Sequence, residues 1–441
     1  MPRQPNVLLI NTHDSGRHFG CYGVDEVQTP NVDRLAENGV RLTEFHAADP
    51  QCAPSRCSLL TGQHPQRNGM MGLPSSGFEW SLDEDTRHLA EHLSNSGYYA
   101  AQFGFQHEAQ SSDIDDLGFN SVDDSVRPGP DLAADVASFF TDYDREQPFY
   151  AQVGLFETHN PLDFGGAKPD RENGIAIPPY LADESASREY LAQFQGLLKQ
   201  GDDAVGIILD ALEEAGLRES TLVIFTSDHG IPFSRAKGYL YDAGTGIPLI
   251  FQWPEGGLSG GEEIDVLASS VDFLPTLFEL VGLPVPEEID GESFADCLDP
   301  SSGTDEADHR DAIFGMFHDH RRWGFAPDCR SVRTGRYKLI RNFESGSHFE
   351  PPIDLSNLGR LGRDGLKTGD TRPPVELYDL ETDPHEFENV AEDPEYADIR
   401  QRLEQRLRDH MESVDDPILE GPPPSPFAER ALAEFEKTDD N

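Results

Sequence analysis

Lysine is scarce in this sequence, and positive charge is scarce with it. Only six of the 441 residues are lysine, and 34 basic residues face 82 acidic ones, which gives a formal net charge of −48. Such a surface repels nucleic acids and anionic membranes, so we expect neither as a partner. Most of the carboxylates are expected to be solvated, as on proteins from salt-saturated cytoplasm, where salt screens self-repulsion. An anionic ligand would therefore need local cations to bind.

Long apolar runs and cysteine patterns are lacking as well. No apolar segment reaches the length of a membrane span, and the N-terminus enters a strand-like run without the features of a secretory signal. We expect a soluble, cytoplasmic protein, with a Tat-type export route left open. The five cysteines show no CxxC spacing, so neither a disulfide framework nor a zinc ribbon is indicated. They are Cys21, Cys52, Cys57, Cys297 and Cys329.

What the sequence does contain is a regular alternation of apolar runs and helical periodicity. This alternation predicts an α/β fold, a doubly wound sheet with helices on both faces. The predicted strands are 6–11, 98–105, 148–156 and 222–227. The predicted helices begin at Pro30, with Gly39 as the stop, and cover about 84–96 and about 187–215, where Gly216 is the terminator.

The pattern changes near a polar linker at about 299–310. Shorter strands are predicted beyond it, at 331–333, 337–340 and 376–380, followed by a helix at about 393–412. We expect the acidic, proline-rich tail from about 415 to be loosely ordered. The sequence thus predicts a catalytic domain over 1–305 and a smaller C-terminal α+β subdomain over 306–441.

Four predicted strands run into polar, chemically capable residues. These are His13-Asp14, His107, Glu157-Thr158-His159 and Asp228-His229. Each alone is more often a cap or a loop hydrogen-bonder. In open α/β sheets, however, ligands bind beyond the carboxyl ends of the strands, so four such ends together predict one site.

The segment around Cys52 is the fifth element of this site. Pro54 suits a first helical turn, Ser55 to Thr61 can continue it, and Gly62 can close it. Cys52 would then lie just ahead of a helix N-terminus, where free N–H groups favour an anion. A buried free cysteine and a reactive thiol remain alternative interpretations.

The run Cys52-Ala53-Pro54-Ser55-Arg56, followed by Leu59-Leu60-Thr61-Gly62, resembles the sulfatase signature. The opening strand with Asp14, the segment Phe225 to Gly230 and the segment Glu376 to Leu380 resemble further sulfatase motifs, so the likeness spans nearly the whole chain. It implies an alkaline-phosphatase-like α/β/α sandwich with a large, mostly parallel sheet and a smaller C-terminal α+β subdomain. Within the family, the stretch Leu222 to Phe233 is most similar to the sulfamidases, also called heparan N-sulfatases.

The resemblance implies a specific chemistry. A formylglycine-generating enzyme would oxidise Cys52 to formylglycine, whose hydrate attacks sulfur beside a divalent metal ion. Arg56 would steady the nucleophile, His107 would take its proton, His159 would serve the leaving group and Lys237 would clamp the sulfate. The implied metal ligands are His13, Asp14, Cys52, Asp228 and His229.

Two positions depart from the family pattern. His13 stands where the family usually has aspartate, and it either ligates the metal or hydrogen-bonds a ligand. Ca²⁺ is the favoured ion, while imidazole ligands leave Mn²⁺ or Zn²⁺ open. Phe105 occupies the usual position of a catalytic lysine, so one sulfate-binding cation is missing unless Lys237, Arg56 or Arg235 compensates. From the small subdomain, His318-Asp319 and Arg330 are further candidates for substrate recognition.

The predicted function is hydrolysis of a sulfate ester or sulfamate of a small molecule or sugar, such as an N-sulfoglucosamine. Two alternatives remain: a phosphodiesterase or phosphonate monoester hydrolase of the same superfamily, and a non-catalytic binder of sulfated glycans. The sequence leaves open whether the chain forms a homodimer.

Overall fold

The computed structural model describes residues 4–75, 78–299, 309–318, 328–343 and 372–421. Its centre is an eight-stranded sheet in the order β5-β4-β6-β1-β7-β8-β2-β9. The first five strands are parallel, β8 runs antiparallel to both of its neighbours, and β9 is parallel to β2. The strands are β1 (Asn6–Thr12), β2 (Val40–Leu42), β4 (Tyr99–Gly104), β5 (Ser121–Asp123), β6 (Phe149–Gly154), β7 (Thr221–Ser227), β8 (Leu249–Gln252) and β9 (Glu262–Ile264).

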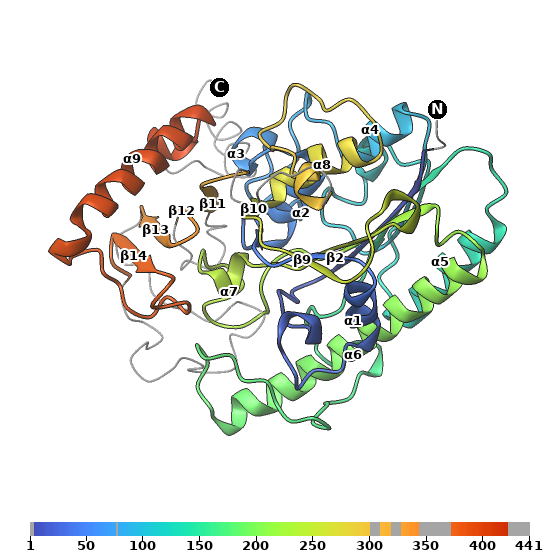
Figure 1. Ribbon diagram of the computed structural model, residues 1–441, viewed down its shortest axis with the longest axis horizontal. Helices are drawn as coiled ribbons and strands as arrows, with labels where there is room; N and C mark the ends of the chain where they lie inside the picture. Colours follow the sequence, from blue (N-terminus) through green and yellow to red (C-terminus); the bar gives the residue numbers. More distant parts are fainter. Residues whose placement is uncertain (1–3, 76–77, 300–308, 319–327, 344–371, 422–441) are drawn as a thin grey trace, which may run out of the picture.

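Helices cover both faces of this sheet, as the alternating pattern predicts (Figure 1). On one face lie α1 (Pro30–Glu37), α5 (Gly129–Asp142) and α6 (Ser185–Glu214), and on the other lie α2 (Cys52–Thr61), α4 (Leu89–Asn95) and α8 (Phe273–Leu280). In β1, Leu8 and Ile10 pack into the core on the side of α1, α5 and α6, whereas Val7 and Leu9 pack into the core on the side of α2, α4 and α8. A strand buried on both faces must be apolar throughout, which is why this segment reads as a continuous apolar run. The predicted α/β class is confirmed.

A second, antiparallel sheet follows in the C-terminal part of the chain. It has the order β11-β12-β13-β14, with β11 (Ile313–Phe317), β12 (Cys329–Arg333), β13 (Tyr337–Asn342) and β14 (Val375–Asp379). One of its faces packs on α9 (Ala397–Ser413) through Leu403, Leu407 and Met411. Its other face packs on Tyr239 to Tyr241 of the large unit. The predicted boundary at 305/306 lies outside the described residues.

Short elements connect these two units and the loops. They are β3 (Phe45–His46), β10 (Ala268–Ser269), α3 (Pro65–Asn68), α7 (Asp242–Thr245) and the 3-10 turns η1 (Gly20–Tyr22), η2 (Ile114–Leu117), η3 (Phe164–Gly166), η4 (Pro254–Gly256), η5 (Ser270–Asp272), η6 (Ala295–Leu298), η9 (Pro394–Tyr396) and η10 (Pro417–Leu419). Within the described residues, no helix is both long and apolar enough to cross a membrane.

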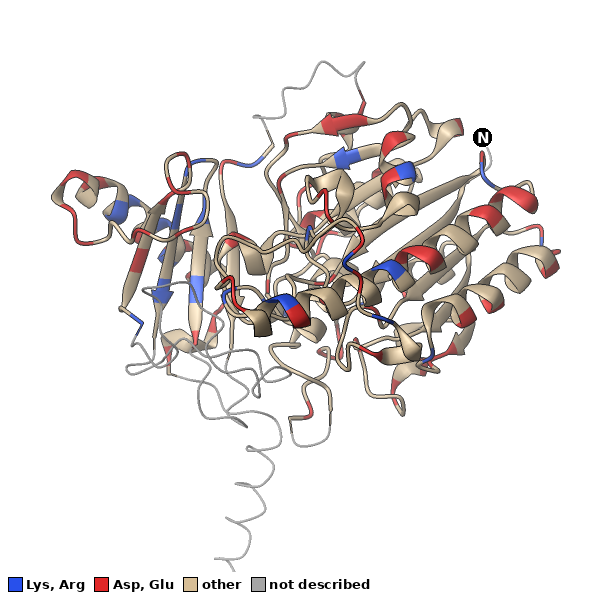
Figure 2. Ribbon diagram, turned by 90° about the horizontal axis from the view of Figure 1, so that it is seen from below, with Lys and Arg blue, Asp and Glu red and all other residues tan. Residues whose placement is uncertain are grey.

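Acidic residues are spread over most of the elements, and basic residues are few (Figure 2). Two of the four lysines in the described residues are nevertheless buried, Lys237 at 9% exposure and Lys338 at 1%. Lys338 pairs with Asp242 and Glu386, and so joins the small sheet to α7. The ammonium group of Lys338 is therefore held at two specific carboxylates, in a chain that has few lysines.

The start of the acidic tail is more ordered than the sequence predicts. Asp416 is 2% exposed, and both of its oxygens accept hydrogen bonds from Arg330, at 2.5 and 2.8 Å. Ile418 is buried in the small core. The expectation of a loose tail from about 415 is therefore wrong for residues 415–421, and the remainder of the tail lies outside the described residues.

Replacing Arg330 with methionine should destabilise this subdomain. The change leaves the buried Asp416 carboxylate without its cation, which costs about 3–5 kcal/mol of unfolding free energy. Urea unfolding measures the loss. The matched control is Arg406→Met, because Arg406 makes a similar two-bond pair with Asp311, whose side chain is 81% exposed. That variant should lose about 1 kcal/mol or less; equal losses in the two variants would contradict the prediction.

Helix α4 begins five residues later than the predicted start at 84, because His88 caps it. The Nδ1 atom of His88 accepts a hydrogen bond from the Ala90 N–H at 3.1 Å. Burial lowers the pKa of His88 to about 3, with His92 adding to the effect. The unfolded chain takes up a proton below a pH of about 6.5, while the folded chain does not, so this group removes stability as the pH falls.

The variant His88→Asn tests this linkage, since asparagine keeps a capping acceptor and does not titrate. Between pH 7 and pH 5, the wild type should lose about 2 kcal/mol more unfolding free energy than the variant does. Urea unfolding at a series of pH values, at constant salt, gives the difference. Parallel pH dependences of the two proteins would show that His88 is charged in the folded state.

Candidate active site

The four predicted strand ends lie side by side in the sheet. Strands β4, β6, β1 and β7 are consecutive and parallel, so their carboxyl ends meet at one edge. The His13 ring lies 4.5 Å from the ring of His159 and 4.8 Å from that of Phe105, between centroids. Residues more than 140 positions apart in the sequence thus come together, as the strand-end pattern predicts.

Five of these residues form a compact cluster. His13, Asp14, Cys52, Asp228 and His229 each offer one ligand atom within 4.8 Å of all the others. Asp14 has a positive φ of 55°, which turns its backbone so that its N–H donates to Asp228 Oδ1 at 2.8 Å. Aspartate tolerates this left-handed conformation better than most residues. The backbone therefore brings the two carboxylates together directly after their strands.

Cations keep both carboxylates ionised. Burial favours protonation, but Lys237 and His229 outweigh it at Asp14 and hold the pKa of that carboxyl below its usual value. Lys237 Nζ lies 2.8 Å from Asp14 Oδ2. At Asp228, the neighbouring His13, His229 and Arg56 outweigh burial and hold the pKa of that carboxyl below its usual value as well. Two buried anions at this distance favour a cation between them.

The donor set fits a divalent metal ion. Carboxylate oxygens suit Ca²⁺, and imidazole nitrogens suit Mn²⁺ or Zn²⁺. His13 Nδ1 donates to Asp14 Oδ1 at 2.6 Å and lies 3.2 Å from Asp228 Oδ2, so its ring is oriented by the two carboxylates. The buried Nε2 atom of His13 has no hydrogen-bond partner within the described part of the chain. His13 is thus placed both to orient the carboxylates and to offer a ligand nitrogen.

Cys52 is the first residue of α2, one position further into the helix than the sequence predicts. Gln51 is the N-cap residue, and Gly62 closes the helix with φ 69°. The Cys52 Sγ atom is 3.4 Å from His229 Nε2. Ser55, one turn later, donates from its hydroxyl to the Asp228 carbonyl, which fixes α2 against the end of β7. Residue 52 thus lies in the first turn of α2, at the positive end of the helix dipole, which favours an anionic group there.

Arg56 lies in the same helix and is buried, at 1% exposure. Its Nε donates to Asp228 Oδ2 at 3.3 Å, and a terminal nitrogen is 3.8 Å from Glu108 Oε1. Its guanidinium carbon lies 5.2 Å from the centre of the Phe105 ring. Phe105 is half-buried and packs against the Arg56 guanidinium, at a position where the family usually has a lysine.

The two remaining histidines flank the cluster. Burial lowers the pKa of His107 to about 3, with Arg56 as the next cause, so the ring is neutral near pH 7. His107 Nδ1 has no hydrogen-bond partner among the described residues. The Nδ1 atom of His159 donates to the Asn160 carbonyl at 2.7 Å, which fixes the orientation of the ring beside His13.

Three candidates for substrate recognition are placed elsewhere. Arg235 cannot replace the missing cation, because it donates to the His385 and Glu386 carbonyls and lies over the Tyr241 ring. Arg330 does not reach the rim, since its pair with Asp416 holds it in the small core. His318 is buried against Asp328. Asp319 lies outside the described residues.

Two further residues support the cluster: Thr158, which the sequence places at a strand end without assigning it a role, and Glu108, which the sequence does not single out. Thr158 donates from its hydroxyl to the backbone carbonyls of His13 and Asp14, at 3.1 Å each. Glu108 faces Arg56 and accepts the His107 backbone N–H at 3.1 Å. Both residues are adjacent in sequence to a predicted site histidine, His159 or His107, and this adjacency could have pointed to them. Nothing in the sequence, however, shows that their side chains turn back toward the site.

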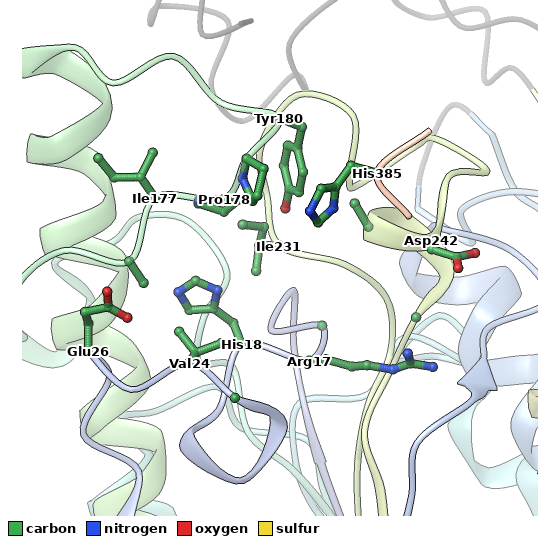
Figure 3. Close-up of a pocket in the computed structure, with 16 residues that line it drawn as sticks. Arg17, His18, Val24, Glu26, Ile177, Pro178, Tyr180, Ile231, Asp242 and His385 are labelled. Carbon is green, nitrogen blue, oxygen red and sulfur yellow. The ribbon is translucent and has the colours of Figure 1, made fainter. Parts of the chain in front are cut away.

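A hollow of about 420 Å³ lies nearby, with His18, Tyr180 and His385 on its walls (Figure 3). Gly16 and Ile231, which follow the metal-site residues in the chain, also line it. The five clustered residues are not part of its lining within the described chain. The hollow therefore lies beside the cluster and is lined by other residues.

Comparison with known proteins agrees with this geometry. The sulfatase family model matches residues 5–283, and a model described as N-sulphoglucosamine sulphohydrolase, C-terminal, matches residues 229–357. The chain is 26% identical to an ulvan-active sulfatase of Formosa agariphila, over 94% of this chain and 76% of that protein. It is 27% identical to human N-sulphoglucosamine sulphohydrolase, over 95% and 92%.

A solved structure of a 2-O GAG sulfatase superposes with a TM-score of 0.73 at 25% identity, covering 95% of this chain and 94% of that one. The sulfatase model alone matches more than half of the chain. Both the site and the whole fold therefore lead to one assignment. The chain belongs to the sulfatase family and is a sulfuric ester hydrolase.

Proposed function

We propose that the protein hydrolyses the sulfate ester or sulfamate of a sulfated sugar, with a formylglycine made from Cys52 as the nucleophile. The observation that carries this proposal is the position of Cys52 at the N-terminus of α2, beside two buried aspartates. The sulfated-sugar substrate is supported by the likeness to human N-sulphoglucosamine sulphohydrolase and to the ulvan-active sulfatase. We propose that a formylglycine-generating enzyme modifies the chain in the cytoplasm.

The residues divide the chemistry as follows. With a hydrated formylglycine at residue 52, one hydroxyl, already deprotonated, would attack sulfur, and the bond between sulfur and the leaving oxygen or nitrogen would break. His159 would give a proton to that leaving atom. His107, neutral near pH 7, would take the proton of the second hydroxyl; the electrons left on that oxygen would form the aldehyde C=O bond while the carbon–oxygen bond to sulfate breaks, and water would then rehydrate the aldehyde. Arg56 and Lys237 neutralise the sulfonate oxygens.

The metal ion would be held by Asp14, Asp228, His229 and residue 52, with His13 as a further donor. When bound, it supplies positive charge that lowers the pKa of an attacking hydroxyl and polarises the sulfate. Asp14 and Asp228 are buried and ionised, so they are ready to bind it without a change in protonation.

Replacing Lys237 with alanine should lower kcat/KM for a sulfate ester by about 100- to 1000-fold, because one sulfate-binding charge is lost where Phe105 has already replaced another. Steady-state kinetics at constant salt measures this loss. The control is Lys199→Ala, an exposed lysine in α6 paired with Asp203. Lys237→Arg should retain more activity than the alanine variant. An unchanged kcat/KM in Lys237→Ala would remove this residue from the sulfate clamp.

The function itself is tested by comparing substrates on one purified sample. Wild-type protein should release sulfate from an aryl sulfate or from N-sulfoglucosamine, faster than it releases phosphate from the matching ester. Faster turnover of a phosphodiester or phosphonate monoester would instead favour the second hydrolase interpretation. The third outcome is a protein whose residue 52 is shown to be modified and which binds a sulfated sugar without hydrolysing it. That result would favour the interpretation as a non-catalytic binder of sulfated glycans.

A further inference from the structure

Glu108 is a buried carboxyl that the proposed chemistry does not use. It is 1% exposed and follows His107 directly in the chain. Its two oxygens face two different active-site residues. Oε2 accepts the His107 backbone N–H at 3.1 Å, and Oε1 lies 3.8 Å from a terminal nitrogen of Arg56. One side chain therefore joins the helix that carries Arg56 to the loop that carries His107.

The loop itself does not need this carboxylate for its shape. Gln106 Oε1 accepts the N–H groups of Glu108 and Ala109, at 2.9 and 3.1 Å, and Gln106 also donates to the Ala109 carbonyl. The turn after β4 is thus closed by Gln106. An apolar residue at position 108 would avoid the desolvation of a carboxyl group, so burial of an acid here calls for another reason.

That reason lies in the environment of Arg56. Its guanidinium has Asp228 on one side, the Thr12 carbonyl at 3.4 Å and the Phe105 ring across its face. Glu108 supplies the second acidic group: burial raises the pKa of its carboxyl, and Arg56 opposes that shift. Asp228 is the nearer of the two, at 3.3 Å against 3.8 Å, so loss of Glu108 would leave the guanidinium paired on the side of the metal site alone. Balanced between two carboxylates, Arg56 keeps a fixed position beside residue 52.

We infer that Glu108 is a positioning residue, which holds the Arg56 guanidinium and the His107 loop in one fixed arrangement. This inference rests on the proposed function, in which Arg56 binds sulfate and His107 accepts a proton. Glu108 itself touches neither substrate nor nucleophile. It acts through both residues at once, so the sulfate-binding cation and the proton acceptor keep a constant separation during turnover.

Kinetics of Glu108→Gln tests the role. The variant keeps the shape and an acceptor oxygen but loses the charge, and kcat should fall about 10- to 100-fold with KM changed less than about threefold, as for other supporting partners. The matched control is Asp202→Asn, a buried carboxylate that accepts the Asn31 and Val32 N–H groups far along the chain from the site. The control should lose stability and keep its kcat.

A double-mutant cycle with Arg56→Lys separates positioning from general destabilisation. If Glu108 acts through Arg56, adding Glu108→Gln to Arg56→Lys should lower kcat by less than about threefold more. Fully additive losses, or an unchanged kcat in Glu108→Gln, would overturn the inference.

Hydrogen exchange at the His107 amide gives a readout that needs no turnover. The amide should exchange slowly in the wild type and in Asp202→Asn, and at least about tenfold faster in Glu108→Ala, which removes the acceptor. An unchanged rate in Glu108→Ala would overturn the positioning role whatever the enzyme hydrolyses. Accelerated exchange in Glu108→Ala, together with a wild type that cleaves no sulfate ester, would contradict the proposed function and leave the structural role of Glu108 supported.

Discussion

Replacing Cys52 with alanine is expected to lower kcat for sulfate-ester hydrolysis by about four orders of magnitude or more, because the nucleophile is removed. The fold should survive the change, since alanine fits a helix and Cys52 contributes one small side chain to α2. Steady-state kinetics and thermal unfolding on the same samples measure the two effects.

Cys57 provides the matched control, as a second fully buried cysteine in the same helix. Burial and the neighbouring Glu108 raise the pKa of its thiol, so Cys57 is expected to stay inert. Cys57→Ala should keep kcat within a few-fold of the wild type. Comparable losses of activity in the two variants would show that the Cys52 effect is structural.

Mass spectrometry decides the chemical identity of residue 52. The peptide that contains it should be about 18 Da lighter than the cysteine form, as the aldehyde, or close to the cysteine mass when hydrated. A protein that turns over sulfate esters while residue 52 remains entirely a thiol would contradict the formylglycine proposal.

Removing the metal with a chelator is expected to have the second largest effect. Activity should fall to background, and the melting temperature should drop by several degrees, because two ionised and buried aspartates lose their counter-ion. At a free ion concentration of 1,000 times Kd, a bound ion contributes about 4 kcal/mol to the unfolding free energy. Differential scanning calorimetry before and after chelation measures this contribution independently of turnover.

Readdition of single ions identifies the metal. Ca²⁺ is favoured by the aspartates, and a stronger response to Mn²⁺ or Zn²⁺ would show that His13 and His229 act as ligands. The variant Asp228→Asn should bind the ion weakly and show a much smaller change in melting temperature on chelation. An equal change in that variant, or no metal in the purified wild type by elemental analysis, would contradict the assignment of the site.

The architecture and the place of the candidate site follow from patterns within the sequence. Apolar periodicity located β1, β4, β6 and β7, because strands buried on both faces are apolar throughout. Polar residues directly after those strands then pointed to one edge of the sheet, since parallel strands share their carboxyl ends. The signature around Cys52 added the family and a candidate for the nucleophile.

Which charged side chains belong to that edge depends on how the two sheets pack. In the sequence, Arg235 is a candidate for the missing sulfate-binding cation and Arg330 a candidate for substrate recognition, but Arg330 pairs with Asp416, 86 positions away, and Arg235 with backbone carbonyls of the small subdomain. Lys237 instead reaches Asp14 across 223 positions. A long side chain has several carboxylates or carbonyls within reach of its segment, and the packing of the two sheets selects one of them. The same packing turns Glu108 toward Arg56, which the strand-end pattern alone leaves undetermined.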